Sequence, residues 1–411
     1  MMLLAVSVVG LALLGVGLRF PILPVLLAVP ATFLVVRVGA AGSGNSLSIA
    51  DILLLVATVA ALPLMRWPGA TRLKQLFVLV LIYQASTLFS VIDHPNRYDI
   101  LEWFHQLLLV AGSAIVGYVI VDRGHAKQAL SMFLIVAASL SIWVVAEIPA
   151  NGLHLATLPG GLQKNFLGDL FVAAVLIAQV KPGWSGLKGR WVQWAKYICV
   201  LGVIGSGARQ SMITLIVVVG FLYLRKGGLA KRSKVLVAVL IPAGAVAYVT
   251  IASQLSSTQI NSLSIRSVQY HQSLALWQQF PLFGVGERFW YTGLYGQVSQ
   301  PPNAEISMLA TGGIIGLLGF LVLIFGSLRL LWRLPAAAGT LAFAVLLSRV
   351  IEGQFDIFWV SASGSLPWII AGMGLAAASR IRRREDTLPS PTTASNGARG
   401  VMGSRSSVNP L

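Results

Sequence analysis

The chain has 411 residues, of which 56% are hydrophobic and only 10% are charged. A soluble domain is nearer one quarter charged, so this composition excludes an ordinary soluble protein and indicates a helical membrane protein. The net charge of +17 does not predict nucleic-acid binding, because the basic residues form short clusters between apolar runs and no stripe with interleaved aromatic residues.

Thirteen apolar runs follow one another along the chain, each close to the roughly 20 residues that cross a bilayer. The first two are joined by a very short hinge, so we expect an all-α, polytopic transmembrane helical bundle of about 12–13 spans. Residues 1–252 are predicted to hold ten spans, and residues 304–384 the C-terminal ones. The runs lie at about 2–18, 21–37, 49–65, 75–92, 105–121, 128–147, 166–180, 191–205, 210–224, 234–252, 304–328, 336–351 and 357–378.

Two segments fall outside this bundle. Residues 253–303 are predicted to be a long extracytoplasmic loop that contains short amphipathic helices, and loops of this length are usually functional. Residues 385–411 are rich in Ser, Thr, Pro and Gly and are predicted to form a disordered cytoplasmic tail.

The basic residues predict the orientation. Of the 30 Lys and Arg residues, 23 lie on the side of the loops that includes the C-terminal tail, which the positive-inside rule places in the cytoplasm. Ten of the 13 acids lie on the opposite side. We therefore expect a multi-pass protein of the bacterial cytoplasmic membrane, with its C-terminus inside and its active face extracytoplasmic. The alternative explanation for the acids collecting on the outer side is that the outer loops are simply longer.

The first polar motif runs from Gly160 to Asp169, at the outer end of the predicted span 166–180. Lys164 is expected at the membrane surface, and Asn165 and Asp169 share one helix face through their i, i+4 spacing. An acid one turn into an apolar helix is expensive in lipid and tends to be paired or functional. Alternatively, Asn165 caps the helix and Asp169 turns outward.

The second motif, Gly205 to Ser211, is a glycine-rich turn that opens the apolar helix 210–224. Arg209 is therefore predicted at a helix N-terminus, where a guanidinium beside free backbone amides suits phosphate oxygens. The alternative role for this arginine is a plain interfacial anchor.

The third motif is a predicted amphipathic helix over Ile265 to Trp277. Arg266, Tyr270 and Trp277 fall close to one face of it, and a sugar or diphosphate site would use such residues. His271 lies in the same helix, although a single histidine is a weak indication. A surface helix without chemistry is the alternative.

The fourth motif combines the segments 280–286, 300–305 and 311–316. Asn303 is predicted to cap the helix that follows, and Glu305 then lies in its first turn. An acid in the first turn of a helix is common, so a purely structural role for Glu305 stays open. No Walker loop, dinucleotide fingerprint or zinc motif is present in the sequence, so neither a cofactor nor a metal is expected.

Together these segments resemble the O-antigen ligase and O-antigen polymerase superfamily of bacterial membrane glycosyltransferases. The resemblance covers most of the chain and depends on the motifs in combination, because each is weak by itself. It is carried by Lys164-Asn165 with Gly168, Ala208-Arg209, Arg266 followed by Trp277, Pro281 to Gly286, Pro302-Asn303, and Thr311 to Gly316.

The resemblance implies a metal-independent transfer of a glycan from an undecaprenyl-diphosphate carrier to a hydroxyl on another glycan or a lipid, by a polymerase or a ligase. It implies that Arg209 and Arg266 hold the diphosphate and stabilise its leaving charge. Polysaccharide-assembly proteins are a further partner left open. The predicted substrate-binding residues are Lys164, Asn165, Asp169, His271, Arg288 and Asn303.

One position departs from the family pattern. The family usually has a histidine that acts as base on the acceptor directly before the asparagine of the fourth motif, and this chain has Pro302 there. Glu305 is the first candidate for the base, followed by His271 and Asp169, because a carboxylate in a partly dry site can have a raised pKa.

Two other functions are considered. A transporter or flippase of lipid-linked sugars would need polar residues near the middle of the membrane and two halves related by a repeat, and the sequence shows no such repeat. A non-catalytic member of a polysaccharide assembly complex is consistent with the missing histidine.

Overall fold

A computed structural model of the chain describes residue 15 and residues 19–36, 47–66, 70–151, 157–158, 162–224, 262–296 and 298–387. Most of these residues are helical, and the one sheet among them is the antiparallel pair β1 (Thr157–Leu158) and β2 (Leu162–Gln163). The predicted all-α fold class is confirmed. The predicted span 234–252, nearly all of 2–18, and the predicted tail beyond Thr387 lie outside the described residues.

The helices vary from one to several turns. In chain order they are α2 (Ile22–Leu27), α3 (Ile49–Ala61), α4 (Thr71–Asp93), α5 (Arg97–Leu107), α6 (Ser113–Asp122), α7 (Ala126–Asn151), α8 (Lys164–Val180), α9 (Arg190–Gly205), α10 (Arg209–Leu224), α12 (Ser262–Gln279), α13 (Ala304–Trp332), α14 (Ala336–Glu352) and α15 (Ser361–Thr387). A π-helical turn (Leu108–Gly112) joins α5 to α6, and short 3-10 turns lie at Pro30–Phe33, Leu62–Leu64, Gly183–Ser185 and Phe289–Tyr291.

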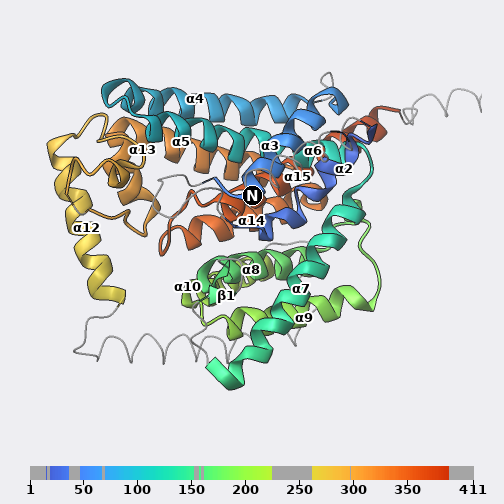
Figure 1. The fold of residues 1–411 in the computed structure, drawn as a ribbon. Helices are drawn as coiled ribbons and strands as arrows, with labels where there is room; N and C mark the ends of the chain where they lie inside the picture. Colours follow the sequence, from blue (N-terminus) through green and yellow to red (C-terminus); the bar gives the residue numbers. More distant parts are fainter. Residues whose placement is uncertain are drawn as a thin grey trace, which may run out of the picture.

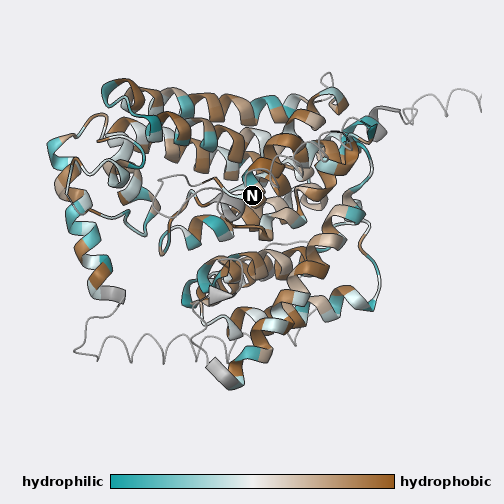
Figure 2. Cartoon of the chain, viewed as in Figure 1, coloured by the Kyte–Doolittle hydropathy of each residue, from teal (hydrophilic) through white to brown (hydrophobic). Residues whose placement is uncertain are grey.

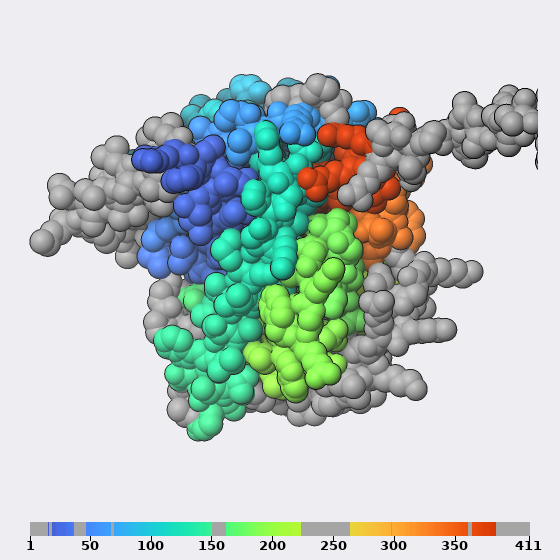
Figure 3. Space-filling model, turned by 90° about the vertical axis from the view of Figure 1, so that its right-hand side faces the viewer, coloured from blue at the N-terminus to red at the C-terminus, as the bar shows by residue number. Residues whose placement is uncertain are grey.

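The helices pack in two groups. In one group α4 lies along α13, and α6 lies along α15, while in the other α9 packs against both α7 and α8 (Figure 1). Helix α14 connects the groups because it packs on α15 and also on α8 and α10. Helix α12 lies at one edge and packs against α13. Turned by 90°, the molecule shows α7 crossing one face diagonally beside α9 (Figure 3).

Within the described residues, four helices are long and apolar enough to cross a membrane: Thr71–Asp93, Arg97–Asp122, Ala126–Pro149 and Ala304–Trp332. Shorter apolar helices lie at Ile49–Leu64 and Arg209–Leu222. Hydrophobic residues predominate along α4 and α8, whereas α12 carries hydrophilic residues over much of its length (Figure 2). The polytopic helical bundle is thereby confirmed, and the number of 12–13 spans stays a prediction.

Helices α5 and α6 form one continuous span that begins earlier than the sequence indicated. The expected start was residue 105, but the helix begins at Arg97. Polar side chains such as Asp99, Glu102 and His105 in this first part are buried. A helix can carry charges at this depth only if they find partners inside the protein, which hydrophobicity by itself does not report.

Helices α6 and α15 cross at two glycines. A Cβ added to Gly117 would lie 1.8 Å from the carbonyl oxygen of Ile369, and one added to Gly372 would lie 2.1 Å from that of Ala114. The two backbones are therefore in direct contact. Small residues at such crossings are the usual means by which transmembrane helices approach closely, because packing between them gains no hydrophobic driving force.

Helix α13 is broken at Gly313, whose φ of 61° and ψ of −163° are accessible essentially to glycine alone. The freed backbone groups pair with the segment that precedes the helix. Val285 N–H donates to Ala310 O (2.9 Å) and Gly286 N–H to Thr311 O (3.0 Å), while Ile314 N–H donates to Pro281 O (2.9 Å). Irregular backbone in a membrane protein requires such satisfaction. The first and last segments of the fourth motif therefore form one structural unit.

Candidate functional site

Three cations from three separate motifs gather at the beginnings of α8, α10 and α12. Lys164 is the first residue of α8, Arg209 is the first residue of α10, and Arg266 lies in the first turns of α12. All three are half-buried and lie outside the predicted spans. Burial and the nearby Arg209 and Arg266 lower the pKa of Lys164, and burial and Arg266 lower that of Arg209. This mutual repulsion creates a site that favours an anion.

A loop after α14, residues 353–360, connects the first two of these helix ends. The Asp356 Oδ2 atom accepts one hydrogen bond from Asn165 Nδ2 and another from Gln210 Nε2, each 2.9 Å long. Asn165 and Gln210 follow Lys164 and Arg209 directly in the sequence. The first and second motifs are therefore joined by a single carboxylate that the sequence analysis did not single out.

Asp169 does not turn outward. It is buried and forms an ion pair with Arg349 Nη1 (2.9 Å), and its Oδ1 atom accepts a hydrogen bond from Ser211 Oγ (3.1 Å). Arg349 also donates to the carbonyl oxygens of Ile357 (2.6 Å) and Phe358, so it holds the same loop. The expense of an acid in the apolar helix is thus offset by a pairing that only the fold brings about.

Behind this pair lies a small cavity between α8, α14 and α15. It is lined by Asp169, Leu170, Ala173, Val345, Ser348, Arg349, Glu352, Leu366 and Pro367. Glu352 lies 3.9 Å from the Arg349 guanidinium, so two acids share one arginine. The cavity therefore belongs to the interior that supports the loop 353–360.

The fourth motif reaches the same loop. Asn303 caps α13 as predicted, because its Oδ1 atom accepts from Ile306 N–H (2.9 Å), and its Nδ2 atom donates to Gln354 O (3.3 Å). Gln354 Nε2 donates to Glu305 Oε1 (2.8 Å), and Glu305 Oε2 has no hydrogen-bond partner among the described residues. The loop 353–360 thus joins three of the four sequence motifs.

The position that replaces the family histidine contacts α12. Tyr270 Oη donates to the carbonyl oxygen of Pro302 (3.2 Å), which ties the third motif to the fourth. Burial raises the pKa of Tyr270, and the nearby Arg266 opposes this shift. His271, one residue further, is exposed, and its Nδ1 atom contacts only Ser267 O of its own helix (2.7 Å) among the described residues.

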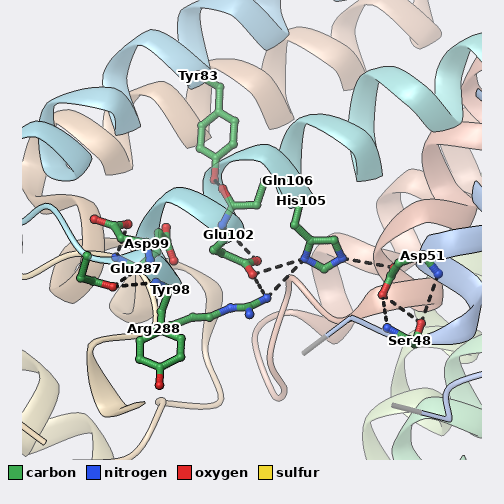
Figure 4. Close-up of polar contacts among 11 residues, drawn as sticks. Ser48, Asp51, Tyr83, Tyr98, Asp99, Glu102, His105, Gln106, Glu287 and Arg288 are labelled. Atoms are coloured by element: carbon green, nitrogen blue, oxygen red, sulfur yellow. Dashed lines mark hydrogen bonds and ion pairs between the residues drawn. The ribbon is translucent and has the colours of Figure 1, made fainter. Parts of the chain in front are cut away.

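Arg288 belongs to a different, buried network (Figure 4). Its guanidinium pairs with Glu102, which also contacts His105 Nδ1 (3.3 Å), and His105 Nε2 contacts Asp51 Oδ1 (3.2 Å). Asp51 forms a capping box with Ser48 at the start of α3. Arg288 therefore anchors the segment before α13 to α5 and α3. Its positive charge, which was predicted to bind substrate, pairs with Glu102 instead.

Glu287 extends this network toward the break in α13. Its N–H group donates to Asp99 Oδ1 (2.8 Å), and its carboxyl group accepts a hydrogen bond from Thr311 Oγ1 (3.2 Å). Burial and the neighbouring Asp99 carboxylate raise the pKa of Glu287 to about 7. No cluster of three or more His, Cys, Asp or Glu residues able to hold a metal ion occurs among the described residues.

The fold and these contacts define a helical membrane protein with a cationic site where the ends of several helices meet. Residues 194–324 match the family model described as O-antigen ligase. This match confirms the predicted resemblance to the O-antigen ligase and polymerase superfamily. No curated protein matches the chain. The matched stretch contains Arg209, Arg266 and Glu305, whereas the first motif and the loop 353–360 lie outside it.

The family match supports a glycosyltransferase activity of the ligase or polymerase type, in a bacterial membrane, on lipid-linked glycan and acceptor substrates. Among the residues predicted from sequence, the structure brings together Lys164, Asn165, Asp169, Arg209, Arg266, Asn303 and Glu305. It places Arg288 elsewhere and leaves His271 on the surface. Sequence reasoning missed Arg349, Gln354 and Asp356. Arg349 lies within the predicted span 336–351, and Gln354 and Asp356 are polar residues that follow this span.

Proposed function

We propose that the protein transfers a glycan from an undecaprenyl-diphosphate carrier to a sugar hydroxyl on the extracytoplasmic face of the cytoplasmic membrane, without a metal. The observation that carries this proposal is the gathering of Lys164, Arg209 and Arg266 at the ends of three helices. A diphosphate offers the negative charge that would relieve their repulsion. Preorganised cations of this kind stabilise charge that develops on a leaving group.

In the reaction the bond between the anomeric carbon and the diphosphate oxygen breaks, and a bond from that carbon to the acceptor oxygen forms. The bond electrons leave with the diphosphate, where Arg209 and Arg266 hold the charge. The acceptor hydroxyl loses its proton to a base. Arginine is suited to the first task because its planar fork binds phosphate oxygens bidentately.

We assign the base to Glu305, because Pro302 occupies the family position of the histidine. Gln354 holds one Glu305 oxygen at 2.8 Å, and the other oxygen has no hydrogen-bond partner among the described residues. A carboxylate oriented in this way is able to accept a proton. If Glu305→Gln retained full transfer activity in membranes, Glu305 would be excluded as the base.

The test of the proposed reaction uses the purified protein in nanodiscs with the lipid-linked glycan that a deletion strain accumulates. Arg209→Ala and Arg266→Ala are each expected to lower the transfer rate by about 100-fold or more. Arg329 lies in the last turn of α13, at the opposite end from Glu305. Arg329→Ala is the matched control and should leave the rate unchanged. Equal rates in all four proteins would refute the role of the two arginines.

Deletion of the gene separates the remaining alternatives. Accumulation of single repeats on the carrier would identify a polymerase, and accumulation of finished chains on the carrier would identify a ligase. If neither accumulates and the cell-surface glycan is unchanged, the proposed reaction is refuted. A purified protein that moves lipid-linked sugar across vesicles but forms no glycosidic bond would be a flippase.

A further inference from the structure

Asp356 has an arrangement that the proposed reaction does not yet use. One of its oxygens, Oδ2, accepts both the Asn165 amide of α8 and the Gln210 amide of α10. Its other oxygen, Oδ1, accepts the N–H group of Ile357 at 2.8 Å, which fixes the orientation of the carboxylate. A charged acceptor makes such bonds stronger than neutral ones. Asp356 therefore clamps the beginnings of two helices to one point.

Each clamped amide follows a cation of the candidate site directly in the sequence. Asn165 follows Lys164, and Gln210 follows Arg209. Adjacent residues have their Cα atoms about 3.8 Å apart, so a clamp on the amides also restrains the two cations. Lys164 and Arg209 repel each other, which would drive the two helix ends apart without such a restraint.

Two further contacts make this junction rigid. A Cβ added to Gly168 would lie 2.8 Å from Ser211 Cβ and 2.9 Å from Ala208 Cβ, so α8, one turn beyond Asn165, is in direct contact with residues on either side of Gln210 at the beginning of α10. Arg349 holds the loop on its other side, through the carbonyl oxygens of Ile357 and Phe358. Asp356 is thus fixed both to the two helix ends and, through its loop, to the buried Arg349.

We infer that Asp356 is a positioning residue that sets the spacing of Lys164 and Arg209, and that this spacing makes the site selective for a diphosphate over a monophosphate. The inference rests on the proposed function, because it takes a diphosphate as the ligand. Two phosphate groups engage two cations at once only if the cations are held at a matching distance. A single phosphate has no such requirement, so its binding depends on total charge and less on spacing.

The test measures the dissociation constants of undecaprenyl diphosphate and undecaprenyl monophosphate for the purified full-length protein in nanodiscs. The wild type should bind the diphosphate at least about tenfold more tightly. Asp356→Ala should reduce this ratio to about two, with the monophosphate constant changed less than about threefold. Asp356→Asn should retain an intermediate ratio, because its carbonyl oxygen can still accept from the two amides.

Asn165→Ala and Gln210→Ala each remove one side of the clamp, and they keep the test decisive if Asp356→Ala does not fold. Each should lower the ratio partly. Asp93→Asn, an exposed acid at the end of α4, is the matched control and should keep the wild-type ratio.

Three results would overturn the inference in distinguishable ways. If the wild type does not prefer the diphosphate, the proposed function and the inference fail together. If the wild type prefers it and the Asp356 and amide variants keep that preference, only the positioning role fails. An equal loss of affinity for both lipids in these variants would indicate a general structural role and would also refute selectivity by spacing.

Discussion

The break in α13 provides the sharpest test of how this fold is held together. Gly313 has a positive φ of 61°, and a Cβ added to it would lie 2.2 Å from the carbonyl oxygen of Leu282. Gly312 directly before it lies among helical residues, and its added Cβ would meet only Met308 Cε at 3.5 Å. Alanine adds one methyl group at either position. At Gly313 this methyl group would collide with backbone atoms, whereas at Gly312 it would contact only the end of a flexible side chain.

The expected magnitudes follow from this geometry. Strain of a non-glycine residue in this region costs about 1–3 kcal/mol. Relief of the clash moves the segment 281–286 away, which weakens the backbone hydrogen bonds that Val285, Gly286 and Ile314 donate, each contributing about 1 kcal/mol. We expect Gly313→Ala to lower the free energy of unfolding by about 4 kcal/mol. Gly312→Ala should raise it by about 0.5–1 kcal/mol, as alanine does in a helix interior.

The assay is denaturant-induced unfolding in detergent micelles, followed by tryptophan fluorescence. Limited proteolysis at the segment 281–288 gives a second measurement, because a displaced segment is cleaved faster. Gly313→Ala should be cleaved faster than the wild type, and Gly312→Ala should not. If the two variants unfold within about 1 kcal/mol of each other, the discontinuous helix and its pairing with this segment are refuted.

Three other predictions concern buried groups. The Glu287 pKa of about 7 lies above the ordinary 4.5, so the folded protein binds this proton more tightly than the unfolded chain does. The free energy of unfolding should therefore fall by about 3 kcal/mol on account of Glu287 as the pH rises from about 4.5 to about 7, and Glu287→Gln should show a smaller fall than the wild type over this range. Arg349→Met leaves Asp169 buried without its charged partner and should destabilise the protein by about 3–5 kcal/mol, part of which Asp169→Asn should restore in the double variant. Gly117→Ala should destabilise by at least about 2 kcal/mol in the unfolding assay, because the backbone of α15 at Ile369 occupies the space of the added methyl group.

The candidate site was predictable in its parts but incomplete as a whole. Lys164 and Arg209 stand out in the sequence because a cation beside an apolar run on the less basic side is unusual, and Arg266 stands out in the predicted amphipathic helix of the outer segment. Asp356 and Gln354 carry no such signal, since they are ordinary polar residues in a short loop. Their roles arise from distant partners such as Asn165 and Glu305, which lie 191 and 49 residues away in the sequence.

The burial of charges shows the same limit. Arg288 in the sequence is a basic residue of an outer loop, and it was predicted to bind substrate. In the structure it pairs with Glu102, and this polar cluster explains why the helix starts at Arg97 and not at residue 105. Hydropathy reports the solvent that a residue prefers, but it does not report whether a partner inside the protein replaces that solvent.

The sequence by itself determined the class of the protein. Apolar runs of membrane length force helices, because a helix is the structure that satisfies its own backbone in lipid, and the polar motifs between them indicated a phosphate site and a family. Only the tertiary structure decided which motifs meet. It showed that Asp356 joins α8 to α10, that Asp169 is paired with Arg349, and that α13 is broken. Such pairings depend on the packing of distant helices, and no local pattern of residues records that packing.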